Sequence, residues 1–225
     1  MGSETPDRDT APTARDLLTN RTVITDTVVP PVLFVGANAL LGLAAAAGAS
    51  VGLSLVLLAV RLLRRQRLLY ATSGLAGTLT AVAFALWAGQ AEAYFLPGVV
   101  TNAVFGVVAV ASVLVRRPLI ALTSAAIYRW PLGWYWHPRV RPAYSEITWA
   151  WAALYLTKAG LQWVLVQRAE LGWLAVARIL TGWPAFALLL LGTYAYVDRR
   201  LRSLGGPNVE QYRAAAAPEA TATGA

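Results

Sequence analysis

The sequence predicts an all-α fold: a polytopic transmembrane helical bundle with six spans and both termini in the cytoplasm. Hydrophobic residues make up 57% of the 225 residues and charged residues only 13%, a balance that excludes an ordinary soluble domain. Apolar segments recur that reach the roughly 20 residues needed to cross about 30 Å of hydrocarbon. Basic residues gather in alternate connections between these segments. We therefore expect a multi-pass protein of the bacterial cytoplasmic (inner) membrane.

The apolar segments define the six expected spans. The charge-free run Val28–Val60 is too long for one span, so we expect two helices, over about 29–47 and 50–63. Their hairpin is placed at Ala47-Gly48-Ala49-Ser50, and Pro30 and Pro31 are placed in the first turn of the first helix. The remaining spans are expected over roughly 70–87, 95–115, 148–166 and 171–197.

The orientation follows from the arginines, because basic residues in short loops are retained on the cytoplasmic side. All of the 19 basic residues except Lys158, Arg168 and Arg178 fall on one side of a six-span arrangement. They are Arg8, Arg15, Arg21, Arg61, Arg64, Arg65, Arg67, Arg116, Arg117, Arg129, Arg139, Arg141, Arg199, Arg200, Arg202 and Arg213. Both termini are then cytoplasmic, and anionic lipid headgroups are the expected partners of these arginines.

Three segments lie outside the spans. Residues 1–22 and 203–225 are polar or of low complexity, and we expect disordered cytoplasmic tails on either side of a six-span domain covering 23–202. The loop 118–145 mixes Trp and Tyr with Arg and His137. We expect short interfacial helix and loop on the cytoplasmic membrane surface there. Because topology accounts for the arginines, no nucleic acid is expected as a partner.

The composition also limits the chemistry. The chain has no cysteine and one histidine, which excludes disulfides, thiolate sites and histidine-pair metal sites. No expected span holds two carboxylates or a histidine, and no glycine-rich phosphate loop is present. We therefore expect no catalytic residue, no metal, no cofactor and no enzymatic activity.

Five polar side chains lie inside the expected spans and are candidates for an intramembrane site: Asn38, Asn102, Lys158, Gln162 and Arg178. Ionisable groups within a bilayer are costly, so they mark functional sites by default. Lys158 lies near the middle of the fifth span, one turn before Gln162. Together the five would form a net-positive pocket able to hold an anion or a lipid headgroup. Alternatively, Arg178 extends outward to Glu170 or water, and Lys158 is satisfied by neighbouring helices as a packing contact.

Several motifs resemble those of a known family. They are Gly89–Gly98 with Gln90, Glu92, Pro97 and Gly98, then Arg117-Pro118, then Arg141 with Tyr144, and then Trp149. Over about residues 25–197 the chain resembles the actinobacterial membrane-protein family of unknown function DUF3159. That family is distantly similar to the intracellular septation protein A family, which implies an association with the cell envelope and division.

Two functions remain open at this point. The leading interpretation is a non-enzymatic scaffold or accessory protein of the envelope or of division, which contacts protein partners through the loop 118–145. The alternative is a small transporter or channel for an ion or a small anionic solute, which uses the polar cluster around Lys158. The two differ in whether that cluster is wet and continuous or dry and isolated.

Overall fold

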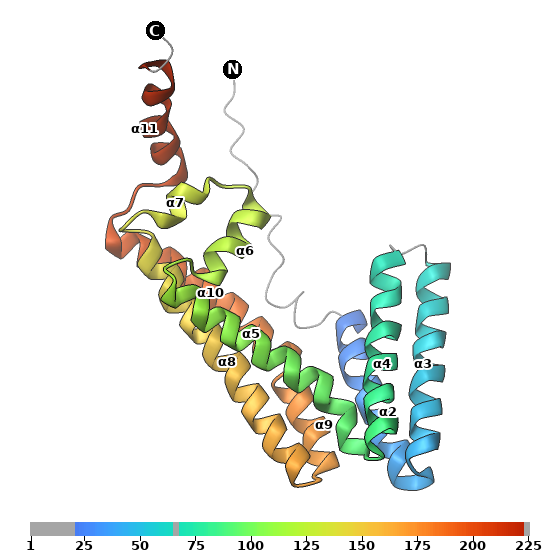
Figure 1. Ribbon diagram of the computed structural model, residues 1–225. Coiled ribbons are helices and arrows are strands. Elements are labelled where there is room, and N and C mark those ends of the chain that lie inside the picture. The colour runs from blue at the N-terminus through green and yellow to red at the C-terminus, as the bar shows by residue number, and fades with distance from the viewer. Residues whose placement is uncertain (1–20, 65–67, 223–225) are drawn as a thin grey trace. The chain divides into compact units, whose positions relative to one another are not determined.

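In the computed structural model, which describes residues 21–64 and 68–222, the chain is helical and contains no strand in those ranges (Figure 1). The helices are α2 (Arg21–Leu41), α3 (Leu43–Leu63), α4 (Leu68–Ala88), the 3-10 helix η2 (Ala91–Phe95), α5 (Leu96–Leu114), α6 (Leu119–Tyr128), α7 (Leu132–Trp136), α8 (Arg141–Gln167), α9 (Leu171–Leu180), α10 (Trp183–Leu204) and α11 (Val209–Ala222). The all-α prediction is confirmed. The expected N-terminal tail falls outside the described residues up to residue 20.

Three segments of the described chain are long and apolar enough to cross a membrane: Leu43–Leu63, Ala91–Leu114 and Leu171–Leu204. Shorter apolar helical stretches cover Val29–Leu41, Thr72–Ala88 and Leu119–Tyr128. These segments indicate a membrane protein. The expected fifth span lies within α8, a helix of 27 residues that also carries Glu146 and Lys158 and is not one of the three.

The chain divides into two compact units. The first unit contains the chain up to Pro97 together with Gln162–Leu188. The second unit contains Gly98–Leu161 together with the chain from Leu189 onward. Each unit is described separately below.

Helices α2, α3 and α4 of the first unit run up and down beside one another (Figure 1). The turn between α2 and α3 is at Gly42, which has a φ of 82°. The predicted hairpin at Ala47-Gly48-Ala49-Ser50 is therefore wrong, since these residues continue α3. A one-residue reversal needs a left-handed conformation, which glycine adopts without steric cost, whereas a run of alanines favours helix.

Small residues let the helices of the first unit approach closely. Its core contains Phe34 stacked on Tyr94 at 4.1 Å between ring centroids, with buried alanines between the helices. The buried alanines are Ala46, Ala47, Ala81, Ala85, Ala91 and Ala175. The first helix also differs from prediction: α2 begins at Arg21, so Pro30 and Pro31 lie inside it and not in its first turn.

The expected sixth span is broken. Helix α9 ends at Leu180 and α10 begins at Trp183. Pro184 has no N–H to donate to the carbonyl of Leu180, and its ring crowds that carbonyl, so a continuous helix is disfavoured there. The Thr181 hydroxyl and backbone N–H both donate to the Ala177 carbonyl, at 2.6 and 2.9 Å, and close the end of α9. The expected sixth span over 171–197 therefore lies within the apolar segment Leu171–Leu204, as two helices and not one.

In the second unit, α5, α8 and α10 lie side by side (Figure 1). Phe105 of α5 stacks on Tyr155 of α8 with ring centroids 5.6 Å apart. Gly106 is buried against Leu156, where any side chain would collide. Trp151 Nε1 of α8 donates to Thr193 Oγ1 of α10 at 3.0 Å. These contacts tie the three helices together.

The loop 118–145 folds into α6, α7 and the start of α8, so the predicted short helices are confirmed. Its aromatic residues pack inward, however: Trp134 is 3% exposed and Tyr135 is fully buried. These two rings therefore pack within the protein, and the position of the loop at a membrane surface stays a prediction. Burial raises the pKa of Tyr135 to about 12. We call this aromatic cluster, built around Ala121, Ala125, Trp134, Tyr135, Val140 and Tyr144, the aromatic cap.

The expected disordered C-terminal tail contains a helix, α11. Asn208 and Gln211 form a reciprocal capping pair at its start: Gln211 N donates to Asn208 Oδ1 at 2.7 Å, and Asn208 N donates to Gln211 Oε1 at 3.0 Å. Tyr212 packs against the aromatic cap, directly over Gly133. Asn208 and Gln211 therefore carry a local helix-start signal within a segment whose composition alone indicates a tail.

Candidate anion-binding cavity

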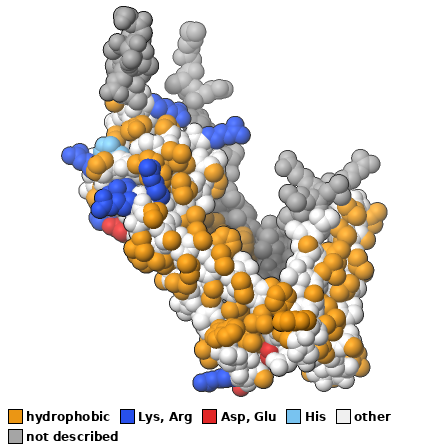
Figure 2. Space-filling view, viewed as in Figure 1, with side chains coloured by type: hydrophobic (Ala, Val, Ile, Leu, Met, Phe, Trp, Pro, Cys, Tyr) orange, Lys and Arg blue, Asp and Glu red, His pale blue; other side chains and the backbone are white. Residues whose placement is uncertain are grey.

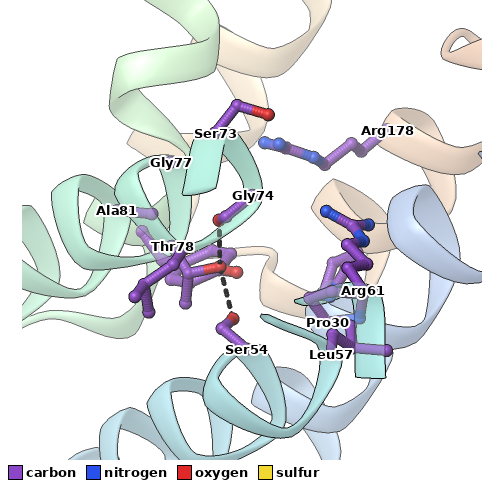
Figure 3. A pocket seen from close by; sticks show the side chains of 13 residues that line it. Pro30, Ser54, Leu57, Arg61, Ser73, Gly74, Gly77, Thr78, Ala81 and Arg178 are labelled. Carbon is purple, nitrogen blue, oxygen red and sulfur yellow. Dashed lines mark hydrogen bonds between the residues drawn. The ribbon is translucent and has the colours of Figure 1, made fainter. Parts of the chain in front are cut away.

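A cavity of about 270 Å³ lies within the first unit (Figure 3). Helices α2, α3, α4 and α9 and the 3-10 helix η2 all contribute to its walls. The lining residues are Pro30, Pro31, Ser54, Leu57, Arg61, Ser73, Gly74, Leu75, Gly77, Thr78, Ala81, Tyr94 and Arg178. The lining is therefore mixed: it contains hydroxyls, two arginines, prolines and leucines, and Figure 3 shows Pro30 and Leu57 beside Arg61.

A short hydrogen-bonded chain forms part of the lining. Ser54 Oγ donates to Thr78 Oγ1 at 2.8 Å, and Thr78 Oγ1 donates to the Gly74 carbonyl at 3.1 Å (Figure 3). Both hydroxyls are buried and lie near the midpoints of α3 and α4. Because both hydroxyl hydrogens are used within the protein, these side chains offer only acceptor capacity to a ligand.

Arg61 enters the cavity from α3. Its Cβ points toward the helix N-terminus, so the guanidinium extends back from the helix end toward the middle of α3. The residue is 8% exposed. A Cβ added at Gly74 of α4 would lie 3.2 Å from Arg61 Nη1, so the glycine provides the space that the guanidinium uses.

Arg178 enters from α9, on a different side. Its guanidinium carbon lies 5.8 Å from the centroid of the Phe95 ring. Tyr94, which is 4% exposed, also lines the cavity and is held by its stacking on Phe34. Figure 3 shows the Arg178 side chain reaching toward Ser73, with the Arg61 guanidinium in the same space.

The arrangement is suited to an anion. Two guanidiniums line the cavity, and no carboxylate is among its described lining residues. Guanidinium groups present forks of N–H donors that match the oxygens of carboxylates and phosphates. The Tyr94 hydroxyl adds a donor of a different kind. No proton-transferring or nucleophilic pair stands out in this lining.

The structure selects one member of the predicted polar cluster for this cavity, Arg178. Asn38 and Gln162 belong to the same unit but do not line the cavity, while Asn102 and Lys158 belong to the second unit. Gln162 is 2% exposed, and its Oε1 accepts no hydrogen bond from the described residues. Lys158 is partly buried, with its Nζ 5.8 Å from the Tyr155 ring centroid. A site around Lys158 stays a prediction.

Sequence reasoning missed Arg61, which it counted among the arginines at a cytoplasmic helix end. Two signals could have identified it. Arg61 lies three residues before Arg64, within the apolar part of the helix, so its side chain starts inside the span. Gly74, Gly77 and Thr78 in the next helix are small, and small residues facing a long cation leave room for it.

The motif residues that carried the family resemblance lie mostly at the corners of the fold. Gln90 and Glu92 lie at the start of η2, and Pro97 and Gly98 lie in the first turn of α5. Pro118 precedes α6 and is buried, Arg141 begins α8, and Tyr144 is buried in the aromatic cap. Arg117 lies over Trp136 at 4.4 Å, whereas Trp149 is 46% exposed. These residues mainly define turns and packing, and none of them lines the cavity.

Comparison with known proteins gives one finding. A family model described as "Protein of unknown function (DUF3159)" matches residues 20–204. No curated protein and no solved structure matches the chain.

Proposed function

The chain belongs to the DUF3159 family of proteins of unknown function, and from its cavity we propose that it is a membrane protein that binds a small anion between Arg61 and Arg178. We place it in the bacterial cytoplasmic membrane with six spans and both termini inside. Its role is non-enzymatic: it binds an anionic solute or headgroup and transports or senses it. The proposed anion site is therefore the cavity lined by Arg61 and Arg178, and not the polar cluster around Lys158 that the sequence predicts.

One observation carries this proposal: two arginines from two helices meet in one cavity of an apolar unit. Burying a charged group away from water is costly, and Arg178 lies inside the expected sixth span. An anion bound beside its guanidinium would compensate this cost, which would give the arrangement a function that packing alone does not.

The six-span topology rests on the helix lengths and on the arginines. Helices α2, α3, α4, α5 and α8 and the α9–α10 pair would form the six spans. In the second unit, Arg side chains gather around α6 and α7, whereas hydrophobic side chains cover α5, α8 and α10 (Figure 2). This distribution supports a cytoplasmic position for the aromatic cap.

Reporter fusions test the topology. A fusion after the C-terminal tail and a fusion after Glu92 should report opposite sides of the membrane. The same side for both would contradict six spans with cytoplasmic termini.

Anion-dependent stabilisation tests the binding function. The unfolding temperature of the purified chain in detergent should rise as an anion that the cavity binds is added to the solution. A ligand that binds only the folded state stabilises that state. Arg178→Gln should abolish this response, and Arg168→Gln, at an exposed position outside the cavity, should retain it. Equal responses in the two variants would contradict the proposal.

The scaffold function is a second candidate, and the folded aromatic cap favours it. The cap joins the segment 118–145 to α11, partly through Trp134 Nε1, which donates to the Pro207 carbonyl at 2.7 Å. A rigid cytoplasmic surface of this kind suits protein partners, and a distant similarity to the intracellular septation protein A family would suit an envelope role. In a deletion strain, loss of complementation on removal of residues 205–225, with Arg178→Gln fully active, would favour the scaffold over the anion site.

A further inference from the structure

We infer that the second unit binds an uncharged lipid in a cavity between α6, α8 and α10. The inference goes beyond the proposed anion-binding function, because it concerns a different cavity and depends on neither Arg61 nor Arg178. The cavity has a volume of about 350 Å³. Small-molecule sites usually measure roughly 300–1,000 Å³ and are lined by apolar and aromatic side chains with a few placed polar groups. The lining described below matches that pattern.

Hydrogen bonds join the three helices around the cavity. The backbone N–H of Ile120, at the start of α6, donates to Thr148 Oγ1 of α8 at 3.3 Å. Trp151 Nε1 of α8 donates to Thr193 Oγ1 of α10 at 3.0 Å. A pair of tyrosines joins α6 to α10. Each pair of helices is therefore linked, so the protein forms the cavity without needing a ligand to assemble it.

The side of the cavity at Trp151 is suited to the apolar part of a ligand. Trp151 and Tyr144 are buried there, each 5% exposed. The Trp151 N–H donates to Thr193 Oγ1, which in turn donates to the Leu189 carbonyl at 2.7 Å. Because both of these hydrogens are used within the protein, Trp151 and Thr193 offer no donor to a ligand.

Along α10 the cavity passes from apolar to polar surroundings. Leu190, Tyr194, Val197 and Leu201 lie at helical spacing on one face of α10, and all four line the cavity. Asp198, one turn after Tyr194, also lines it and is the first charged residue of α10. A ligand with an apolar part near Leu190 and a polar group near Tyr194 matches this order. The cavity therefore suits an amphiphile.

The tyrosine pair supplies a donor for the polar group of such a ligand. The hydroxyls of Tyr128 in α6 and Tyr194 in α10 lie 2.9 Å apart. One of their two hydrogens lies between the oxygens, so the pair keeps one hydrogen to donate. Trp130 stacks on the Tyr128 ring, with centroids 5.1 Å apart, and orients it. A carbonyl or hydroxyl oxygen is a fitting acceptor for the remaining hydrogen.

The charges disfavour an ionic headgroup. Asp198 is the only charged side chain among the described lining residues, and its Oδ2 pairs with Arg202 Nη2 at 2.8 Å. A phosphate would lie beside this carboxylate and be repelled by it. A cationic headgroup would compete with Arg202 for the same carboxylate. An uncharged lipid with carbonyl or hydroxyl oxygens meets neither penalty, and acylglycerols and quinones share this chemistry.

Photolabelling tests the site, with the full chain in phosphatidylcholine vesicles and a diacylglycerol whose acyl chain carries a diazirine. Mass spectrometry should place the cross-links on α6 and α10. Unlabelled dioleoylglycerol in about tenfold excess should lower the labelling about tenfold by mass action. Dioleoyl phosphatidic acid and the cationic dioleoyl trimethylammonium propane should not. Competition by decylubiquinone at a lower mole fraction than dioleoylglycerol would identify a quinone as the ligand, and the reverse order an acylglycerol.

A cavity-filling variant links the labelling to this cavity. Ser124→Leu places a larger apolar side chain in the cavity from α6 and should abolish the specific labelling. Ala126→Leu, at an exposed position of the same helix outside the lining, is the matched control and should be labelled as the unmodified chain is. If Ser124→Leu fails to fold, the competition series on the unmodified chain still decides the outcome.

Variants of the tyrosine pair separate hydrogen-bond donation from packing. Tyr128→Phe and Tyr194→Phe each break the bond between the two rings but leave one hydroxyl to donate, so each should keep most of the labelling. The double variant keeps both rings and loses both hydroxyls. Its labelling should fall by about fivefold, as expected for the loss of one neutral hydrogen bond. An equal loss in the single variants would show that the pair only joins the helices.

Three results would overturn the inference. They are equal competition by the three dioleoyl lipids, cross-links spread beyond α6, α8 and α10, and unchanged labelling in Ser124→Leu. None of these results bears on the anion cavity of the first unit, so the two proposals fail separately.

Discussion

The two units of this protein hold their arginines in opposite ways. In the first unit, Arg61 and Arg178 extend into one cavity whose described lining has no carboxylate. In the second unit, Arg200 forms a two-pronged ion pair with Glu146, at 2.8 Å for each hydrogen bond, and Arg117 lies over the ring of Trp136. The second arrangement pairs one arginine with a carboxylate and stacks another on a ring, whereas the first places two arginines along the lining of a cavity.

The difference in exposure determines how much each arrangement matters. The side chains of Arg200 and Glu146 are 38% and 37% exposed, so solvent screens their attraction and the pair adds little stability. Arg61 is 8% exposed, and electrostatic interactions strengthen as the surroundings become less polar. The role of a charged residue on a helix therefore depends on the surroundings of its charged group, and not on the position of the residue along the sequence.

Loss of Trp134 should have the largest effect on stability. Trp134 is 3% exposed in the aromatic cap and donates to Pro207, so Trp134→Ala removes a large buried side chain and leaves a cavity. We expect a loss of about 3–5 kcal/mol in the second unit. Thermal unfolding and limited proteolysis near Gly205 measure it. Trp149→Ala, at a 46% exposed tryptophan, is the control, and an equal loss there would contradict the inward packing of the cap.

The Glu146 ion pair should give a smaller, pH-dependent effect. Hydrogen bonds from Arg200 hold the pKa of Glu146 below its usual value of 4.5, and a 2.5 Å bond from the Tyr196 hydroxyl adds to this, although partial burial opposes it. The stabilisation is therefore fully present above pH 4.5 and is lost as the pH falls through the lowered pKa. Unfolding curves between pH 6 and about pH 3 should show a steeper acid loss in the unmodified chain than in Glu146→Gln. Identical profiles would contradict the pair.

The smallest effect is expected at Gly74. Gly52→Ala should stabilise the chain by up to about 1 kcal/mol, because alanine favours helix and nothing lies within 4 Å of the added Cβ. Gly74→Ala should gain less and should weaken anion binding, since its Cβ would displace the Arg61 guanidinium by a few tenths of an ångström. Thermal shifts of both variants with and without phosphate check this. Equal behaviour would show that Gly74 does not make room for Arg61.

Composition and apolar run length were enough to predict the helical class and the approximate position of most helices. The turns were harder to predict. Both candidate turns consist of small residues: glycine at Gly42, and alanine, glycine and serine over Ala47–Ser50. Only the packing of the helices determines at which of the two the chain reverses. Pro184 did carry a local signal for the break between α9 and α10, because proline disfavours a continuous helix.

The candidate site was predicted in part. Arg178 was identified because a charge inside an apolar segment is rare. Arg61 was not, because a cation near a helix end satisfies the topology rule equally well whether it points outward or inward. The direction of its side chain depends on Gly74 in the neighbouring helix, and that pairing of helices is not visible in a single sequence.

The central claim is that the cavity of the first unit is cationic, and thiol labelling tests it most directly. The chain contains no cysteine, so Ser73→Cys places a single thiol at the cavity wall. We expect an anionic methanethiosulfonate to react faster than a cationic one of similar size, and we expect phosphate to slow the anionic reagent. Adding Arg178→Gln should reduce this preference, and Ser203→Cys, exposed at the end of α10, should lack the phosphate effect. A cationic reagent that reacts at position 73 as fast as the anionic one would contradict the account.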